Sequence, residues 1–314
     1  MAQNICEYIR KLSVESCFEL AAFRNGWTTW KAQIHNILGK TYNELNILDL
    51  GDHLSSIFET TGNTGRGQSE VSGGGYGWEG LVCWYLNLCM AGSRGVVLRK
   101  ASDSPLPLRN AISVNYGNFR SNTESDITVI IFPDNNIFTR GINLLNVTDG
   151  SGNQIPPFLR SNRFNLAPII NRLTEIHFDD FEVGIVQCKT NWNDNAQIPM
   201  LWSMIYETAN FANPAISVGS GGYSIKDLLR FTYSFCTVPT NDLSGYKPDS
   251  TAVHRVRNLT GGNYWGNPSQ NGVASSIKEI FNNNFRNAFT RNIRATIRST
   301  LSAMKTDFAY FDLL

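Results

Sequence analysis

The sequence predicts an α/β protein in which a central mixed β-sheet is flanked by helices. Two short apolar segments, 127–132 and 181–188, have the length and the β-branched content of buried strands. The segment 231–238, FTYSFCTV, has the same character and is expected to extend the sheet. Apolar residues at helical spacing near both ends of the chain add helical regions before and after this core.

The 314 residues divide into three regions, which together are compatible with one domain. Residues 1–60 are expected to form a helical N-terminal subregion, in which Asn25-Gly26 separates two helices. Residues 61–240 contain the predicted sheet and its inserted loops, with a long glycine-rich loop over 60–77. Residues 241–314 contain a loop with basic and aromatic residues and then one long amphipathic helix, from Ile277 to Met304.

Bulk composition excludes several classes of protein. No apolar run approaches the length of a membrane span, and the N-terminus lacks the basic and then apolar layout of a signal peptide. The six cysteines contain no CxxC pair, so we expect free thiols in a cytoplasmic protein, and neither a zinc site nor a disulfide framework. The net charge of +1 still allows nucleic-acid binding, because a local basic face matters more than the total.

Polar residues interrupt the apolar pattern at the end of the 181–188 strand. Gln187 and Lys189 stand two positions apart, and residues at this spacing project from the same face of a strand. Cys188 between them is expected to point back into the core. A carboxamide beside an ammonium is an unusual choice for packing, and it suits a site that binds a metal ion and polarises a water.

Several carboxylates are candidates for the acid that completes such a site. Asp126 directly precedes the 127–132 strand, where it is either an ordinary turn residue or the partner of Gln187 and Lys189. Asp134, in a Pro-Asp pair at the far end of that strand, and Asp180, which begins the next one, are alternatives to Asp126. Glu79, in a predicted helix over 78–91, either complements the helix dipole or faces the active site.

The order of these elements resembles the PD-(D/E)xK nuclease superfamily and, within it, the type II restriction endonucleases. The resemblance covers roughly residues 77–207 and depends on few residues: Glu79 on a helix, Asp126 before a strand, and Gln187-Cys188-Lys189 at the end of one. It implies a restriction-endonuclease-like fold in a bacterial or archaeal protein. The implied activity is Mg²⁺-dependent hydrolysis of phosphodiester bonds at a specific sequence of double-stranded DNA.

The same resemblance implies a role for each residue. Asp126 and the backbone carbonyl of Cys188 would ligate Mg²⁺. Gln187, at the position where the family usually has Glu or Asp, would be a further ligand. Lys189 would orient or deprotonate the attacking water, and Glu79 would lie near the metal.

The resemblance also implies partners. A palindromic DNA site mirrors a two-fold axis, so we expect a homodimer with N-terminal or C-terminal helices at its interface. Base reading is expected from the polar segments 133–168 and 241–270. The candidate DNA-binding residues there are Arg160, Arg163, Arg255 and Arg257.

Two other classes of function remain open. One is a non-catalytic DNA-binding protein on the same fold, with Gln187 as a sign of lost chemistry. The other is a nuclease of DNA repair or recombination. The four histidines form no HNH-type arrangement, and without a GxSxG motif acyl-transfer chemistry is not expected.

Overall fold

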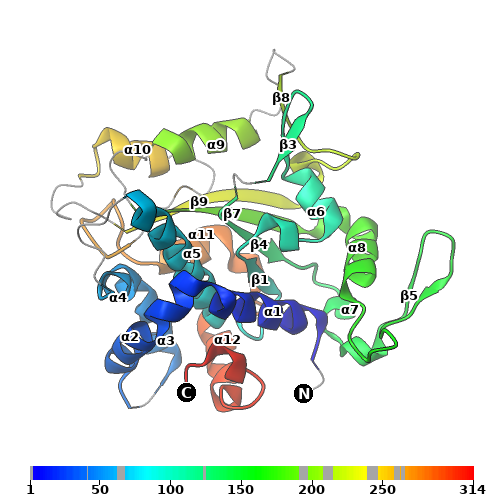
Figure 1. Ribbon diagram of the computed structural model, residues 1–314, viewed down its shortest axis with the longest axis horizontal. Helices are drawn as coiled ribbons and strands as arrows, with labels where there is room; N and C mark the ends of the chain where they lie inside the picture. Colours follow the sequence, from blue (N-terminus) through cyan, green and yellow to red (C-terminus); the bar gives the residue numbers. More distant parts are fainter. Residues whose placement is uncertain are drawn as a thin grey trace.

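The computed structural model describes residues 3–40, 42–61, 68–122, 125–190, 197–207, 215–238, 247–257, 262 and 266–314, and within 68–74 only the backbone. Its central sheet has the strand order β1-β4-β7-β9. These strands are β1 (Gly95–Leu98), β4 (Ile127–Ile131), β7 (Glu182–Lys189) and β9 (Arg230–Thr237). The expected α/β class, with a mixed central sheet flanked by helices, is confirmed (Figure 1).

Strand directions decide which chain segments meet at each end of the sheet. β4 is antiparallel to both β1 and β7, whereas β9 is parallel to β7. The C-terminal ends of β1, β7 and β9 therefore lie beside the N-terminal end of β4. We call this end of the sheet, where the ends of the four strands meet, the site edge.

Both faces of the sheet are buried, so side-chain alternation sends each strand into two separate apolar clusters. Val97, Val129 and Val186 point into one cluster, and their neighbours Val96, Ile130 and Ile185 point into the other. This explains why β4 and most of β7 read as unbroken apolar runs in the sequence.

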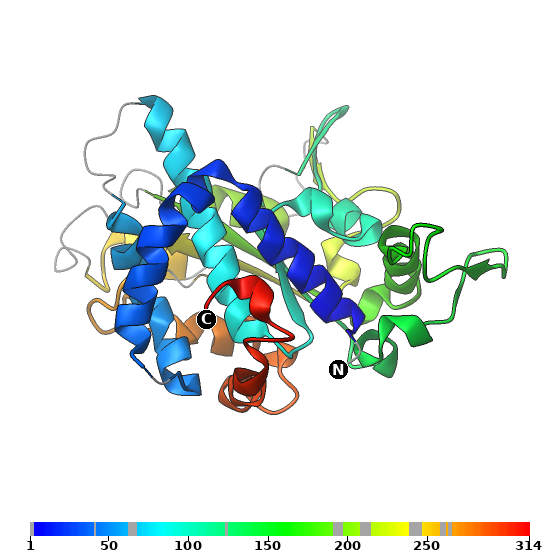
Figure 2. The same cartoon turned by 60° about the horizontal axis from the view of Figure 1, so that its bottom comes forward.

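Helices from distant parts of the chain cover the two faces. The first cluster takes residues from α2 (Ala21–Leu38), α3 (Glu44–Asp49), α4 (Leu54–Glu59), α5 (Gln68–Met90), α11 (Lys278–Asn284) and α12 (Ile293–Thr300). The second takes residues from α6 (Leu106–Ala111), α7 (Asn136–Thr139), α8 (Leu166–Ile176) and α9 (Gln197–Glu207). Helix α1 (Ile5–Glu19) contributes to both, and it runs beside α5 and along the edge strand β1 (Figure 2).

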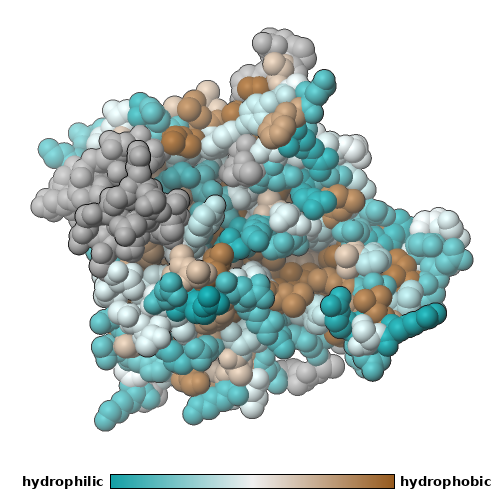
Figure 3. Space-filling model, viewed as in Figure 1, coloured by the Kyte–Doolittle hydropathy of each residue, from teal (hydrophilic) through white to brown (hydrophobic). Residues whose placement is uncertain are grey.

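Smaller elements surround this core. A second sheet has the order β3-β2-β8, formed by β2 (Val114–Tyr116), β3 (Phe119–Ser121) and β8 (Ile216–Val218). A hairpin of β5 (Val147–Thr148) and β6 (Gln154–Ile155) projects from the body of the molecule in Figure 1. Helix α10 (Thr251–Arg257) packs against α9. Hydrophilic side chains dominate the outline of the face seen in Figure 3, and apolar side chains gather near its middle.

The N-terminal region is helical as expected, but the predicted helix break is wrong. α1 ends and α2 begins around Leu20, and Asn25-Gly26 lies inside α2. A Cβ atom on Gly26 would lie 2.6 Å from the ring of Trp30. This glycine is therefore explained by close packing against an aromatic ring within a helix.

The expected glycine-rich loop over 60–77 is also wrong for the part that the structure describes. Helix α5 already begins at Gln68, and residues 62–67 lie outside the described residues. Helix α5 packs against α1, α2 and β1, and at its glycine Gly80 a Cβ would lie 2.7 Å from the ring of Phe23. Glu79 accordingly lies in the body of α5, so its interpretation as a first-turn residue that complements the helix dipole no longer holds.

The single C-terminal amphipathic helix predicted from Ile277 to Met304 is a third error. The chain forms α11, a 3-10 turn over Arg286–Ala288, then α12, and a second 3-10 turn over Leu301–Ala303. The break at Phe285 lets its ring pack so closely on the sheet that a Cβ on Gly184 would lie 2.8 Å from it. Asn292 then starts α12 anew, because its side chain accepts a hydrogen bond from the Ala295 N–H.

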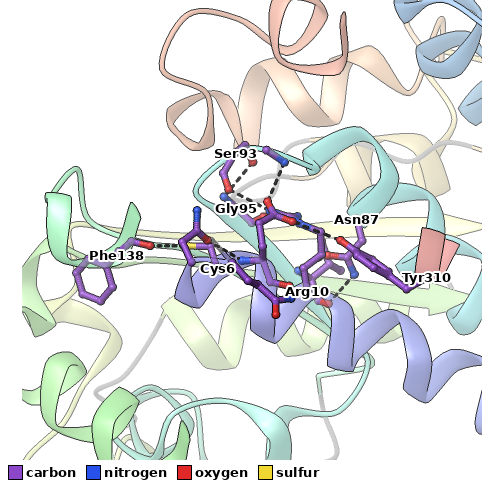
Figure 4. Close-up of polar contacts among 12 residues, drawn as sticks. Cys6, Arg10, Asn87, Ser93, Gly95, Phe138 and Tyr310 are labelled. Carbon is purple, nitrogen blue, oxygen red and sulfur yellow. Dashed lines mark hydrogen bonds and ion pairs between the residues drawn. The ribbon is translucent and has the colours of Figure 1, made fainter. Parts of the chain in front are cut away.

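A buried arginine ties α1 to the central sheet (Figure 4). Arg10 is fully buried, and it donates to the backbone oxygens of Gly95, at 2.7 Å, and Ser93, at 3.0 Å. Its Nε and Nη2 bond to both carboxylate oxygens of Glu7, at 3.0 and 3.2 Å. Tyr310, near the C-terminus, donates to the same carboxylate at 3.3 Å. Helix α1 and the segment around Tyr310 are thus both anchored near the start of the edge strand β1.

Two further expectations concern the whole chain. The six cysteines are free and buried, as predicted. No helix within the described ranges combines the length and the apolar character needed to cross a bilayer.

Candidate functional site

The site edge brings together the residues that sequence reasoning paired. Ile127, the first residue of β4, is opposite Val186 of β7 in the antiparallel register. Asp126 therefore lies opposite Gln187, one step beyond the last strand pair. This placement depends on the antiparallel direction, because in a parallel pair the start of β4 would meet the start of β7.

Three donors converge on one oxygen of Asp126. Its Oδ2 accepts hydrogen bonds from Gln187 Nε2 at 2.7 Å, from the Cys188 N–H at 2.8 Å and from Lys189 Nζ at 3.2 Å. The Asp126 and Lys189 side chains are only 14% and 23% exposed, so the ion pair is partly shielded from water. Oδ1 of Asp126 accepts no hydrogen bond from the described residues, and it remains the oxygen through which Asp126 can bind a ligand.

The side chain of Gln187 donates a hydrogen bond to Asp126, and its own oxygen is already hydrogen-bonded. It is 2% exposed, and its Oε1 accepts a hydrogen bond from the hydroxyl of Tyr233. Both ends of the amide are therefore engaged within the protein, one with Tyr233 and the other with Asp126. Sequence reasoning missed Tyr233, because its approach depends on the parallel pairing of β7 with β9, for which the sequence contains no local signal.

The backbone at Cys188 has the orientation that a ligand role requires. The N–H and C=O of a strand residue point toward the same neighbouring strand. Since the Cys188 N–H points at Asp126, its carbonyl also points toward the β4 side, beyond the first residue of β4. The Cys188 side chain points into the apolar cluster on the α5 face, as predicted.

Glu79 and Asp126 line one cleft at the site edge. Its volume is about 550 Å³, and its lining residues are Gly75, Tyr76, Glu79, Arg99, Lys100, Ala101, Ser102, Asn122, Ser125 and Asp126. Helix α5 supplies Glu79, and the end of β1 supplies the basic pair Arg99-Lys100. Sequence reasoning missed this pair, although two basic residues directly after the apolar segment GVVL were a usable signal.

The surroundings of Glu79 favour its protonated form. Burial, and then the negative charge of Asp126, raise the pKa of Glu79 from its ordinary value of 4.5 to about 8, against the opposing effects of Arg99 and Lys189. Two carboxyl groups thus share one poorly hydrated space. A cation between them would relieve their repulsion.

Glu79→Gln should therefore stabilise the metal-free protein increasingly as the pH rises. The unfolded chain loses the Glu79 proton near pH 4.5, and the folded protein retains it until about pH 8. Stability due to this group is present below pH 4.5 and is lost between pH 4.5 and 8. Urea unfolding at pH 5, 6.5 and 8 should show a gap between variant and wild type that grows to a few kcal/mol, at roughly 1.4 kcal/mol per pKa unit. A gap that does not change with pH contradicts the assignment.

The alternative acids lie at the opposite edge of the sheet. Asp134 follows the C-terminal end of β4, is 82% exposed, and has its carboxylate 3.7 Å from Nε of Arg94. Asp180 precedes β7, is 60% exposed, and lies 3.6 Å from Nδ1 of His177. Of the three candidate aspartates, Asp126 alone contacts Lys189.

The structure does not bring the four candidate DNA-binding arginines together. Arg160 and Arg163 are exposed in the segment that leaves the C-terminal end of β4 and returns to the start of β7, which is the edge opposite the site. Arg255 and Arg257 lie in α10, whose chain follows β9 from the site edge. Arg257 donates to the Gly272 carbonyl at 3.0 Å. Residues 239–246, 258–261 and 263–265 of this region lie outside the described part.

The donor set of the cleft fits Mg²⁺. No group of three or more His, Cys, Asp and Glu side chains with metal-binding geometry occurs among the residues that the structure describes. Mg²⁺ nevertheless keeps several waters and often takes only one or two protein carboxylates. Asp126 and Glu79, which line the cleft, and the carbonyl of Cys188, whose N–H bonds to Asp126, provide hard oxygen atoms of this kind.

No protein-family model matches the chain, and the comparison with curated proteins yields no match. A functional proposal therefore depends on the geometry of the site edge.

Proposed function

We propose that the chain is a Mg²⁺-dependent nuclease of the PD-(D/E)xK type with a restriction-endonuclease-like fold. Its proposed activity is that of a type II restriction endonuclease, which hydrolyses phosphodiester bonds at a specific sequence of double-stranded DNA. The observation that carries the proposal is the convergence of Gln187, Cys188 and Lys189 on Asp126. The cleft shared by Asp126 and Glu79 supports it further.

Each residue has a role in this proposal. Asp126 Oδ1 and the Cys188 carbonyl hold Mg²⁺, which supplies positive charge at the scissile phosphate. Lys189 lies within hydrogen-bond distance of Asp126, where its ammonium orients the attacking water or neutralises charge that develops in the transition state. Gln187 differs from the role implied by the resemblance: it orients Asp126 and is not itself a ligand.

The deciding experiment is cleavage of a long DNA that contains many sequence contexts. The purified protein should cut it in the presence of Mg²⁺ and stop when a chelator is added. Discrete bands support a restriction enzyme, and a smear supports a repair or recombination nuclease. DNA binding without cleavage supports the non-catalytic alternative, which the engaged amide of Gln187 favours.

Gln187→Glu should make the protein more dependent on Mg²⁺. The change replaces the donor that lies 2.7 Å from Asp126 Oδ2 with a second carboxylate, and the repulsion should cost the metal-free protein roughly 1–3 kcal/mol. Bound Mg²⁺ neutralises the pair, so the rise in Tm on addition of Mg²⁺ should exceed that of the wild type. An equal rise in both proteins would place the ion away from Asp126.

We also propose that the chain acts as a homodimer, because cutting both strands of a palindromic site requires two related active sites. Leu12 of α1 and Leu45 of α3 expose 43% and 45% of their surfaces on the N-terminal helices, where the interface was expected. Light scattering should give twice the monomer mass, at least on DNA. A monomer in both the free and the DNA-bound state argues against this assembly.

A further inference from the structure

Two arginines are buried within the described part of the chain, and their surroundings are opposite. Arg10 is fully buried, and every part of its guanidinium is bonded to Glu7 or to backbone carbonyls (Figure 4). Arg99 is 7% exposed, its Nε is buried without a hydrogen-bond partner, and it donates to no described residue. A buried polar atom without a hydrogen-bond partner is costly for a folded protein, so an arginine that forms no hydrogen bond or ion pair within the described residues needs an explanation outside the fold.

Arg99 lines the cleft in which a substrate would bind. It follows Leu98, the last residue of β1, which is paired with Thr128 of β4 near the site edge. Its neighbour Lys100 is exposed, and both residues line the cleft that contains Glu79 and Asp126. The cleft is thus lined by two carboxyl groups, Glu79 and Asp126, and by two basic groups, Arg99 and Lys100, and no carboxylate among the described residues lies within ion-pair distance of Arg99.

We propose that Arg99 and Lys100 form a phosphate-binding subsite, which holds the DNA backbone phosphate next to the scissile one. This inference rests on the proposed function and names how the substrate is held there. The planar guanidinium of Arg99 matches two phosphate oxygens, and its burial strengthens the interaction because water competes less. Lys100 adds a hydrated charge at the mouth of the cleft. The carboxyl groups of Glu79 and Asp126 then bind the cation, and Arg99 and Lys100 bind the neighbouring phosphate.

The first test is calorimetric titration with thymidine 3′,5′-bisphosphate, which contains two phosphates on one sugar. Arg99→Gln should weaken its binding roughly 10- to 100-fold, the loss of a charge-assisted contact. Arg99→Lys, which keeps the charge without the planar fork, should retain part of the affinity. Arg291→Gln removes an equal charge from an exposed position before α12 and should bind like the wild type.

The second test is the thermal stability of the ligand-free protein. Because Arg99 forms no hydrogen bond or ion pair with any described residue, Arg99→Gln should raise the Tm by roughly 2–4 °C. If Arg99 instead stabilised the folded protein, its replacement would lower the Tm. A lower Tm combined with unchanged bisphosphate binding overturns the inference.

These measurements separate the subsite from the nuclease activity. If the wild type binds the bisphosphate, Arg99→Gln does not bind it, and the wild type cleaves no DNA, the subsite is supported and the proposed nuclease activity is overturned. DNA cleavage by the wild type, with Arg99→Gln cutting and binding equally well, overturns the subsite alone. Absence of bisphosphate binding by the wild type also overturns it.

Discussion

Lys189→Ala is expected to abolish Mg²⁺-dependent DNA cleavage while DNA binding stays nearly unchanged. The ammonium contacts Asp126 at 3.2 Å, and in the proposed mechanism it acts on the attacking water, so its loss should cost a factor of ~10²–10⁴ or more in rate. If the protein binds DNA as proposed, its affinity should come mainly from many phosphate contacts elsewhere, which the variant would retain. Asp126 keeps its bonds from Gln187 and Cys188, so the variant should lose only about 1–2 kcal/mol of stability.

The measurement is cleavage of DNA with many sites at several Mg²⁺ concentrations, alongside a binding assay without metal. Lys226→Ala is the matched control, because Lys226 is exposed and precedes β9 at the edge opposite the site. It should cut like the wild type. Cleavage by Lys189→Ala at the wild-type rate would overturn the mechanism and leave Lys189 as a strand-end charge.

Arg10→Leu is expected to cause the largest loss of stability among the variants considered. The change removes the partner of Glu7, whose side chain is only 15% exposed, and leaves the carbonyls of Ser93 and Gly95 without their donor. Breaking a buried ion pair by removing one partner costs roughly 3–5 kcal/mol. This is a large share of a typical domain's total, which is about 5–15 kcal/mol.

Urea unfolding gives the free energy directly, and the same helix provides a control. Lys11 and Glu15 also form an ion pair in α1, but both side chains are 46% exposed. Lys11→Ala should therefore change stability by less than about 1 kcal/mol. The double variant Glu7→Gln, Arg10→Leu should recover part of the loss, since no buried carboxylate remains unpaired. An Arg10→Leu protein as stable as the wild type would show that the network does not hold α1 on the sheet.

Local pattern predicted three of the four strands of the central sheet and the shared face of the polar residues at the end of β7. The runs that became β4 and most of β7 are apolar on both faces, and this is visible in the sequence because it repeats residue by residue. The same alternation placed Gln187 and Lys189 on one face and turned Cys188 into the core. Asp126 was preferred as their partner over Asp134 and Asp180, and the antiparallel pairing of β4 with β7 places it beside them.

Long-range contacts decided what local pattern does not encode. The parallel neighbour β9 brings Tyr233 to Gln187 and turns an expected metal ligand into a residue that orients Asp126. Helix α5 extends through a glycine-rich segment that local pattern assigned to a loop, and the packing of Phe285 against the sheet accompanies the break in the expected C-terminal helix.

The sequence by itself therefore predicted the segments that form β4, β7 and β9 and the side chains that leave the end of β7 together, because both depend on the spacing of neighbours along the chain; it did not predict β1. The tertiary structure alone decided which strand ends meet, because strand order and direction arise from contacts between residues far apart. That decision placed Arg99 and Glu79 in the cleft of Asp126, and it placed Arg160 and Arg163 at the opposite edge.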